Sequence, residues 1–306
     1  MPYTVATSTF NPALNELIEE AFERCGLELR SGYDFRTARR SLNFLLTEWA
    51  NRGINLWTVE QGLIPMVTGQ AMYPLPVETV DLMDMVIRQN NGTTNQVDIN
   101  ISRIAEPTYM SIPTKLAQGR PIQVYINRQS GMENLSTATV AATVSATDTT
   151  ITLTSTAKLS SAGFVKIGTE TISYPNISGN QLINCARGQN NTTAAAHAIG
   201  ATVTVQNLPC INVWPTPNSP GDQYTFVYYR LRRMQDAGNG VNEQDIPFRM
   251  LPALIAGLAF QISVKKAPER SMGLKAEYEE QWMMASTEDR DKAPLRLVPR
   301  NNFYYR

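Results

Sequence analysis

The stretch LSTATVAATVSATDTT, residues 135–150, opens a segment that interrupts the rest of this sequence. The segment is rich in Thr, Ser, Ala and Asn, begins at about residue 134 and ends near residue 207. The chain on either side has the charge density of an ordinary α+β protein. This change of composition predicts a host domain and an insert at residues 135–207 with a separate role.

Two short alternating segments flank the insert. Residues 124–128 read VYINR and residues 211–214 read INVW, and both patterns indicate half-buried strands. With residues 135–207 removed, these strands would pair as neighbours. Insertions are tolerated at exposed tips between adjacent strands, because the host backbone loses few hydrogen bonds there. We therefore expect a discontinuous host domain made of residues 1–134 and 208–291.

The composition is that of a soluble globular protein. Of the 306 residues, 42% are hydrophobic and 18% are charged, and 27 basic residues balance 27 acidic ones. A chain without net charge has no overall field that attracts nucleic acid or an acidic membrane. The N-terminus, MPYTVATSTFNP, lacks the features of a signal peptide, and the strongest apolar run, residues 251–260, is shorter than the roughly 20 residues that span a bilayer. We expect no membrane anchor, and folding in the cytoplasm.

Two helices are expected in the first fifty residues. The first has Asn11 as its cap and Pro12 as its first residue, and Gly26 ends it. The second has Asp34 as its N-cap and Gly53 as its C-cap. Their apolar residues recur at helical spacing, at Leu14, Leu17, Ile18, Ala21, Phe22 and Cys25, and at Ala38, Leu42, Leu45, Leu46 and Trp49. The short loop between them suggests an antiparallel hairpin.

These two helices carry opposite charges. The acidic residues of the first are Glu16, Glu19, Glu20 and Glu23, and the basic residues near the start of the second are Arg36, Arg39 and Arg40. One interpretation is a solvated face on which the arginines pair with the glutamates. The other interpretation is that these seven residues make contacts between subunits.

Strands follow the two helices. They are expected at residues 56–67, 82–88 and 97–101, separated by turns such as QNNGTTNQ, with a short helix between Ser102 and Ile112. After the insert, residues 224–231, YTFVYYRL, are the best strand in the chain.

Two more helices and an irregular end complete the host. Asp245 and Pro247 open a long apolar helix that Pro268 stops. A further helix places Leu274, Tyr278 and Trp282 on one face. The predicted fold class is therefore α+β: an α-helical bundle with a β-strand platform, plus an inserted small all-β barrel or sandwich.

The insert is predicted to be a compact all-β module. Four strand-sized runs are separated by Gly, Asn and Pro turns, at residues 150–154, 164–167, 171–174 and 201–205. Its few charges are Asp148, Lys158, Lys166, Glu170 and Arg187. A domain so poor in charge and so rich in hydroxyl and amide groups suits an exposed decoration or a weak contact surface.

Several phrases of the host, in this order along the chain, resemble a known family. They are ARRSLNFLLTEWANRGINLWTVEQ, GRPIQVYINRQ joined across the insert to INVWPTPNSPGDQYTFVYYR, and DIPFRMLPALIAGLAFQISVKKAPER. The sequence is similar here to the head-to-tail adaptor proteins of short-tailed bacteriophages, over about residues 10–290. The resemblance implies a virion structural protein at the head-tail junction, in a twelve-subunit ring beneath the portal protein. Such a ring stabilises the packaged genome, lets DNA pass through its channel and provides the platform for the tail nozzle or a tail fibre protein.

The insert resembles a small module found among phage structural proteins. The resemblance rests on AGFVKIGTETISYPNISGNQLINCARGQNNTTAAAHAIGATVTV, residues 162–205. The basic adaptor pattern lacks this module, and the resemblance implies no specific role for it.

The sequence contains little that indicates catalysis or a cofactor. His197 is the only histidine, which excludes a multi-histidine zinc site, and its setting among alanines favours a structural over a catalytic histidine. No phosphate-binding glycine motif is present. Glu106 and Glu170 are unremarkable members of a possible carboxylate pair. Cys25 lies on an apolar helical face, and with Cys185 and Cys210 it indicates a reducing compartment rather than disulfides. We expect no enzyme activity and no cofactor.

The C-terminal stretch, residues 292–306, is expected to be an extended tail. It has Pro294 and Pro299, no acidic side chain and an aromatic end. Such a tail orders only against a partner. Arginines contact carboxylates and the aromatic rings fill apolar clefts, so we expect portal binding through Lys292, Arg296, Arg300, Phe303, Tyr304, Tyr305 and Arg306. The resemblance agrees, and DNA in the channel is the alternative partner.

Two further functions stay open from the sequence. A peptidoglycan-degrading tail enzyme would need two carboxylates at one cleft. A tail protein that binds host-surface glycan would act through the inserted module, with the host domain as its mount.

Overall fold

The protein belongs to the α+β class, as predicted. The computed structural model describes residue 10 and residues 12–53, 56–129, 138–218, 224–235 and 245–289, and these residues form five α-helices and four sheets. The chain divides into two compact units. One takes its described residues from Met1–Thr58 and Met234–Arg306 and is helical, and the other spans Val59–Arg233 and contains every strand that the structure describes.

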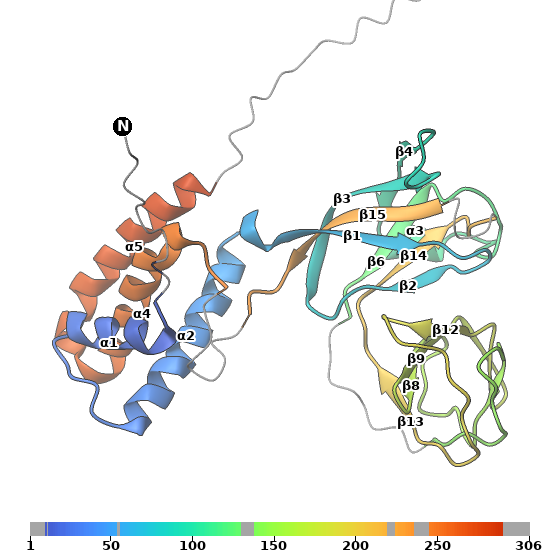
Figure 1. The fold of residues 1–306 in the computed structure, drawn as a ribbon, viewed down its shortest axis with the longest axis horizontal. Helices are drawn as coiled ribbons and strands as arrows, with labels where there is room; N and C mark the ends of the chain where they lie inside the picture. The colour runs from blue at the N-terminus through green and yellow to red at the C-terminus, as the bar shows by residue number, and fades with distance from the viewer. Residues whose placement is uncertain are drawn as a thin grey trace, which may run out of the picture. The chain divides into compact units, whose positions relative to one another are not determined.

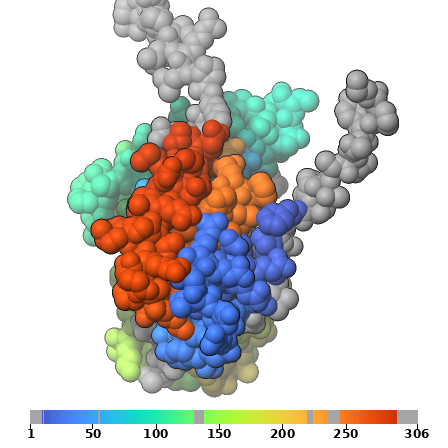
Figure 2. Space-filling model, turned by 90° about the vertical axis from the view of Figure 1, so that its left-hand side faces the viewer, coloured from blue at the N-terminus to red at the C-terminus, as the bar shows by residue number. Residues whose placement is uncertain are grey.

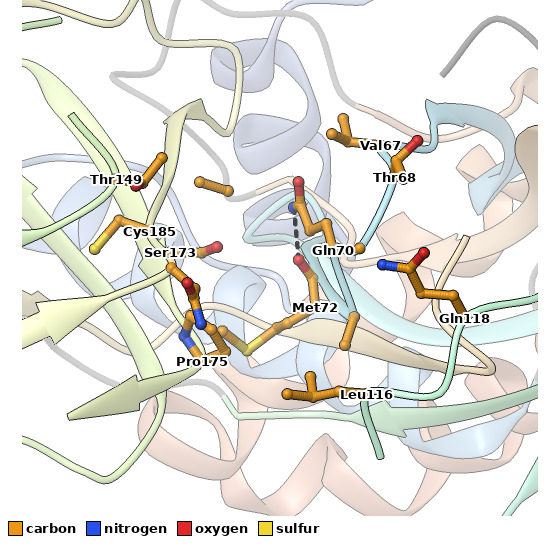
Figure 3. Close-up of a pocket in the computed structure, with 14 residues that line it drawn as sticks. Val67, Thr68, Gln70, Met72, Leu116, Gln118, Thr149, Ser173, Pro175 and Cys185 are labelled. Atoms are coloured by element: carbon orange, nitrogen blue, oxygen red, sulfur yellow. Dashed lines mark hydrogen bonds between the residues drawn. The ribbon is translucent and has the colours of Figure 1, made fainter. Parts of the chain in front are cut away.

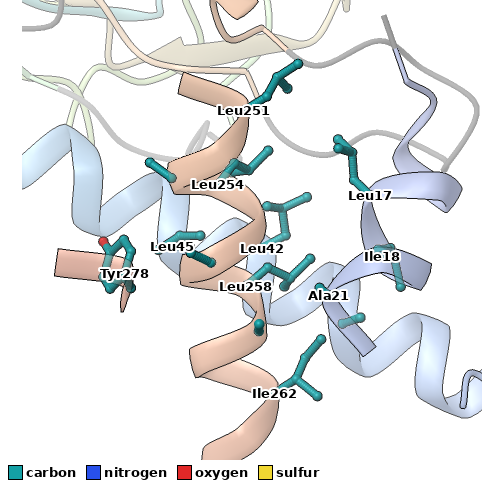
Figure 4. Close-up of a cluster of buried hydrophobic side chains, with 14 of the residues drawn as sticks. Leu17, Ile18, Ala21, Leu42, Leu45, Leu251, Leu254, Leu258, Ile262 and Tyr278 are labelled. Atoms are coloured by element: carbon teal, nitrogen blue, oxygen red, sulfur yellow. The ribbon is translucent and has the colours of Figure 1, made fainter. Parts of the chain in front are cut away.

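The helical unit is built around one apolar helix. Its four helices are α1 (Leu14–Arg24), α2 (Gly32–Arg52), α4 (Leu251–Lys266) and α5 (Ser271–Glu288) (Figure 1). The helix α4 packs against the other three, and its Leu254 and Leu258 lie near Leu42 and Leu45 of α2 (Figure 4). Gly257 permits this close packing, because an added Cβ would lie 2.8 Å from Tyr278 Cε2 and 2.9 Å from Leu45 Cδ1.

The apolar character of α4 follows from its place in this core. By length and composition alone, the helical stretch Phe248–Lys266 could cross a membrane. However, 56% of it is buried inside the protein, as expected of a helix surrounded by other helices.

The starts of three predicted elements are corrected by the structure. The helix α1 begins at Leu14 with Ala13 as a cap that makes no side-chain bond, so Pro12 is not its first residue, and Asn11 lies outside the described residues. A short 3-10 turn, Phe248–Met250, precedes α4, which therefore starts later than the predicted opening at Asp245 and Pro247. Another 3-10 turn, Leu56–Thr58, replaces the beginning of the first predicted strand.

The N-cap of α2 is Ser31 and not Asp34. Ser31 has extended backbone angles, and its hydroxyl accepts a hydrogen bond from the Asp34 N–H at 3.3 Å. A hydroxyl in this position satisfies one of the free N–H groups of the first turn. Asp34 lies inside that turn, where its carboxylate favours the positive end of the helix. Gly53 is the C-cap, as predicted.

Two four-stranded sheets form the larger part of the second unit (Figure 1). The first has the order β1-β15-β3-β4, with strands Val59–Pro65, Tyr224–Arg232, Thr79–Gln89 and Val97–Asn100. The second has the order β2-β14-β6-β5, with strands Met72–Pro74, Cys210–Trp214, Gln123–Asn127 and Ser102–Ile104. All neighbours are antiparallel except β5 and β6. The short helix α3 (Glu106–Met110) lies within residues 102–112, where a short helix was predicted, but the strand β5 at the start of this range was not predicted. Both sheets bury side chains in one shared core around Phe226.

The strands on either side of the insert pair with each other. In β6 and β14, Asn127 lies opposite Cys210 and Gln123 lies opposite Trp214, in antiparallel register. This confirms the pairing predicted for the two flanking segments. The intervening chain leaves and returns at neighbouring positions of one sheet, which is the geometry of an insertion between adjacent strands. The domain limits at residues 134 and 208 stay a prediction.

Residues 138–207 contain strands and turns and no helix. They form a sheet of order β12-β9-β8-β13 and a smaller one of order β10-β11-β7 around a core of their own. The strands are β7 (Ile151–Thr152), β8 (Gly163–Ile167), β9 (Glu170–Tyr174), β10 (Asn176–Ser178), β11 (Gln181–Ile183), β12 (Ala186–Gln189) and β13 (Val203–Gln206). The four predicted runs overlap β7, β8, β9 and β13, whereas the short strands β10 to β12 were not predicted. We call residues 138–207 the β module.

Candidate interaction surface

The four glutamates of α1 form one exposed stripe. Glu16, Glu19, Glu20 and Glu23 follow one another at spacings of three and four residues, so they share one face of the helix, and all four are exposed. The opposite face of α1 is buried in the core of the helical unit. Glu20 pairs with Arg24 at 3.0 Å, and the other three make no ion pair with any described residue. The acidic stripe, as we call these four residues, is therefore mostly not neutralised.

The arginines near the start of α2 form a second stripe of opposite sign. Arg36 and Arg40 are exposed one turn apart, and Arg39 beside them is half-buried. Phe44 comes one turn further on the same face, with 61% of its surface exposed. We call Arg36, Arg39 and Arg40 the basic stripe.

Nothing within the described part of the chain neutralises the basic stripe. The predicted pairing of these arginines with the glutamates of α1 does not occur among the described residues. The neighbouring Lys265 of α4 donates a hydrogen bond to the Ser41 hydroxyl at 2.7 Å. Burial lowers the pKa of Lys265, and the charge of Arg40 lowers it further, so the positive field of the stripe reaches α4.

A network of ion pairs and cation–π contacts joins α2, which carries the basic stripe, to α5. The Arg52 guanidinium lies 2.6 Å from a Glu48 oxygen and 2.8 Å from a Glu279 oxygen. It also lies over the rings of Tyr278 and Trp282, at 5.0 and 5.2 Å from their centroids. Figure 2 looks onto the helical unit and shows α2, in blue, and α5, in red, as adjoining strips of its surface. The aromatic residues of α5 thus serve the core, and Cys25 is buried there as predicted.

The structure corrects the view of Glu170 as an unremarkable residue. Its side chain is fully buried in the β module and receives a bidentate contact from Arg187, with Nε at 2.9 Å and Nη2 at 2.8 Å. The backbone N–H groups of Gly188 and Ala195 also donate to this carboxylate, at 2.9 and 3.1 Å. His197 Nε2 lies 2.7 Å from the same group.

These contacts define the chemistry of Glu170. Burial alone raises the pKa of Glu170, but Arg187, the two N–H groups and His197 together lower it to about 2. An ionised, saturated carboxylate fits a structural role, and His197 has the buried partner that a structural histidine requires. The sequence showed that Arg187 is one of the few cations of the module, but it did not show that Glu170 is buried beside it.

Other predicted site residues are not brought together. Glu106 is exposed on α3, and no contact links it to Glu170. No group of three or more His, Cys, Asp or Glu side chains within the described ranges has the spacing of a metal site. Lys292, Arg296, Arg300, Phe303, Tyr304, Tyr305 and Arg306 of the predicted tail lie outside the described residues.

No protein-family model matches this sequence, and no curated protein matches it.

Proposed function

We propose that this protein is a ring-forming structural connector of a virion, of the head-to-tail adaptor type. The observation that carries the proposal is the pair of opposite charged stripes on α1 and α2. Among the described residues, only Glu20 of these seven residues has an ion-pair partner, Arg24. A contact in which one patch of a subunit meets a different patch of the next is heterologous, and repeated rotation closes such contacts into a ring.

The charges of the stripes set the geometry of this contact more than its strength. Exposed ion pairs contribute about 0–1 kcal/mol each, whereas complementary charge steers the encounter and fixes the register. The exposed ring of Phe44 beside the basic stripe supplies an apolar anchor, the kind of residue that carries affinity at interfaces. The chain has no net charge, so copies do not repel one another as they assemble.

The remaining parts of the proposal rest on the sequence resemblance. The host domain, residues 1–134 and 208–291, is a helical bundle with a β platform, and residues 135–207 are an inserted all-β barrel or sandwich. The ring, a dodecamer by resemblance, lies under the portal protein at the head-tail junction, and DNA passes through its channel without specific binding. The tail nozzle or a tail fibre protein docks below it. The tail, residues 292–306, binds the portal surface.

Sedimentation velocity with purified portal rings tests this proposal. Full-length protein should form a complex much larger than either component, and negative-stain electron microscopy should show an added ring layer. A chain ending at Asp291 should stay folded but no longer dock stably, because it lacks the basic and aromatic tail. The proposal is wrong if the full-length protein remains monomeric beside portal rings, and the tail assignment is wrong if the shortened chain docks unchanged.

A further inference from the structure

A cavity of about 430 Å³ lies inside the unit Val59–Arg233. It lies between the β module and the rest of that unit, on the side of strand β2. One wall is the chain from Val67 to Met72 with Leu116 and Gln118, and the other is made by residues of the β module, among them Ser173 and Pro175 (Figure 3). Its volume lies within the range of pockets that bind small molecules.

The two walls are joined by specific contacts. The side-chain amide of Gln70 donates to the Met72 carbonyl at 2.8 Å and to the Gln189 side chain at 3.1 Å. Met72 is also buried against Phe164 of the β module in a small apolar cluster. The cavity is therefore bounded by residues that hold each other in place.

Ser173 gives the first indication of a ligand. The residue is only 2% exposed, and its hydroxyl makes no hydrogen bond with any described residue. Its oxygen lies on the side that faces Gln70 across the cavity (Figure 3). No buried side-chain nitrogen or oxygen among the described residues lacks a hydrogen-bond partner, so the Ser173 hydroxyl, which makes no such bond, is open to the cavity. A group that enters the cavity can therefore donate or accept a hydrogen bond at this hydroxyl.

The other polar groups of the lining are also uncharged, and four of them lie on exposed residues. The side chains of Thr68, Gln118, Thr149 and Asn184 make no hydrogen bond with the described residues. Hydroxyl and amide groups both donate and accept hydrogen bonds. None of the described residues that line the cavity is a Lys, Arg, Asp, Glu or His. Burial raises the pKa of Cys185, the one lining residue with an ionisable side chain, to about 12, so this thiol is neutral.

This lining selects one class of ligand. A phosphate, a carboxylate or an amine would lose its hydration without finding a counter-charge, which is costly. A sugar ring offers hydroxyl groups that donate and accept, together with C–H surfaces that fit Val67, Leu116 and Pro175. We propose that this cavity binds a neutral carbohydrate, of monosaccharide or disaccharide size. The site is independent of the ring contact proposed above and adds a second activity to the protein.

Saturation-transfer NMR on the full-length protein tests the site. The probes are glucose, galactose, mannose, rhamnose, N-acetylglucosamine and their disaccharides, with glucuronic acid as the charged comparison. At least one neutral sugar should receive saturation, and glucuronic acid should receive none. A cavity that holds only water gives no signal with any of them, and that result would overturn the proposal, as would equal signals from glucuronic acid.

Variants then locate the binding. Ser173→Ala and Gln118→Ala each remove one hydrogen bond to the sugar, so the Kd should rise about five- to tenfold for each. Ser178→Ala, an exposed serine of the same module outside the cavity, should leave the Kd unchanged. The resonance of His197, the only histidine, shows that each variant keeps a folded module. Unchanged binding by folded Ser173→Ala and Gln118→Ala proteins would place the sugar elsewhere and contradict the proposal.

Discussion

The indole Nε1–H of Trp49 donates a hydrogen bond to the hydroxyl oxygen of Tyr278 at 2.9 Å, and both side chains are buried. This bond joins α2 to α5 inside the helical unit. The Tyr278 hydroxyl in turn donates to Glu48 at 3.2 Å, so one hydroxyl links the indole to the charged network around Arg52. The helix that carries the basic stripe is thereby fixed to its neighbour.

Removing that hydroxyl should weaken the helical unit. Tyr278→Phe leaves the Trp49 N–H buried without an acceptor, so the free energy of unfolding should fall by about 1–3 kcal/mol. Urea denaturation followed by tryptophan fluorescence measures the change. Tyr33→Phe, at a residue with 67% of its surface exposed, is the matched control and should have an effect below about 0.5 kcal/mol. Equal stability of the two variants would show that the bond contributes nothing.

Gly257 should not tolerate a methyl group. In Gly257→Ala the new Cβ meets Tyr278 and Leu45 at less than 3 Å, and such overpacking costs about 1–3 kcal/mol. Gly273→Ala on α5 is the control, because its Cβ meets nothing within 4 Å and alanine favours the helix by up to about 1 kcal/mol. The two substitutions should therefore shift the urea midpoint in opposite directions.

The β module should lose stability in acid. The pKa of Glu170 falls from its ordinary value of 4.5 to about 2 in the folded protein. A lowered pKa stabilises the fold fully above pH 4.5, and this contribution is lost as the pH falls toward 2. The resonance of His197 reports on the module alone, so urea titrations followed by NMR from pH 7 to pH 2.5 measure the effect.

Glu170→Gln provides the comparison for this pH dependence. It leaves Arg187 buried without its anion, so the module should be about 3–5 kcal/mol less stable at pH 7. The stability of the variant should also change less between pH 4.5 and pH 2.5 than that of the wild type. The same slope in both proteins would mean that another group controls the acid response.

Elements with a strong local pattern were predictable from the sequence. The apolar faces of α1 and α2 and the strand β15 lie where the spacing of residues placed them, because local periodicity follows from the burial of one face. Helix starts were less predictable. Asp34 was predicted to be the cap of α2, but the cap is Ser31, because only the backbone angles decide which oxygen reaches a free N–H.

Long-range contacts could not be read from the chain. Arg187 and His197 lie 17 and 27 residues after Glu170 and meet it only through the pairing of short strands. The sequence identified the charged residues of α1 and α2 but left open whether they pair, since this depends on how both helices pack on α4. The carbohydrate cavity was not predicted, because the hydroxyls and amides that line it are common throughout the module.

Deleting residues 135–207 should leave a folded host domain. Because Asn127 lies opposite Cys210 in the sheet, a short turn can rejoin the chain without moving β6 or β14. The loss of Phe164 exposes Met72 and Cys210, so a modest fall in stability is expected. Tryptophan fluorescence and sedimentation with portal rings measure folding and docking. Aggregation or failed docking of the shortened protein would show that the module belongs to the host core or to the interface.

The ring contact between the charged stripes is tested most directly by exchanging their charges. Arg36→Glu with Arg40→Glu makes both stripes negative, and Glu16→Lys, Glu19→Lys and Glu23→Lys together make both positive. Sedimentation velocity with portal rings should show that the double variant and the triple variant each fail to assemble, while the variant with all five substitutions, whose stripes are complementary again, regains the ring. Lys158→Glu with Lys166→Glu changes the net charge as much as the arginine pair does and should assemble normally. Normal assembly of both the double and the triple variant, or no recovery in the combined variant, would contradict the proposed contact.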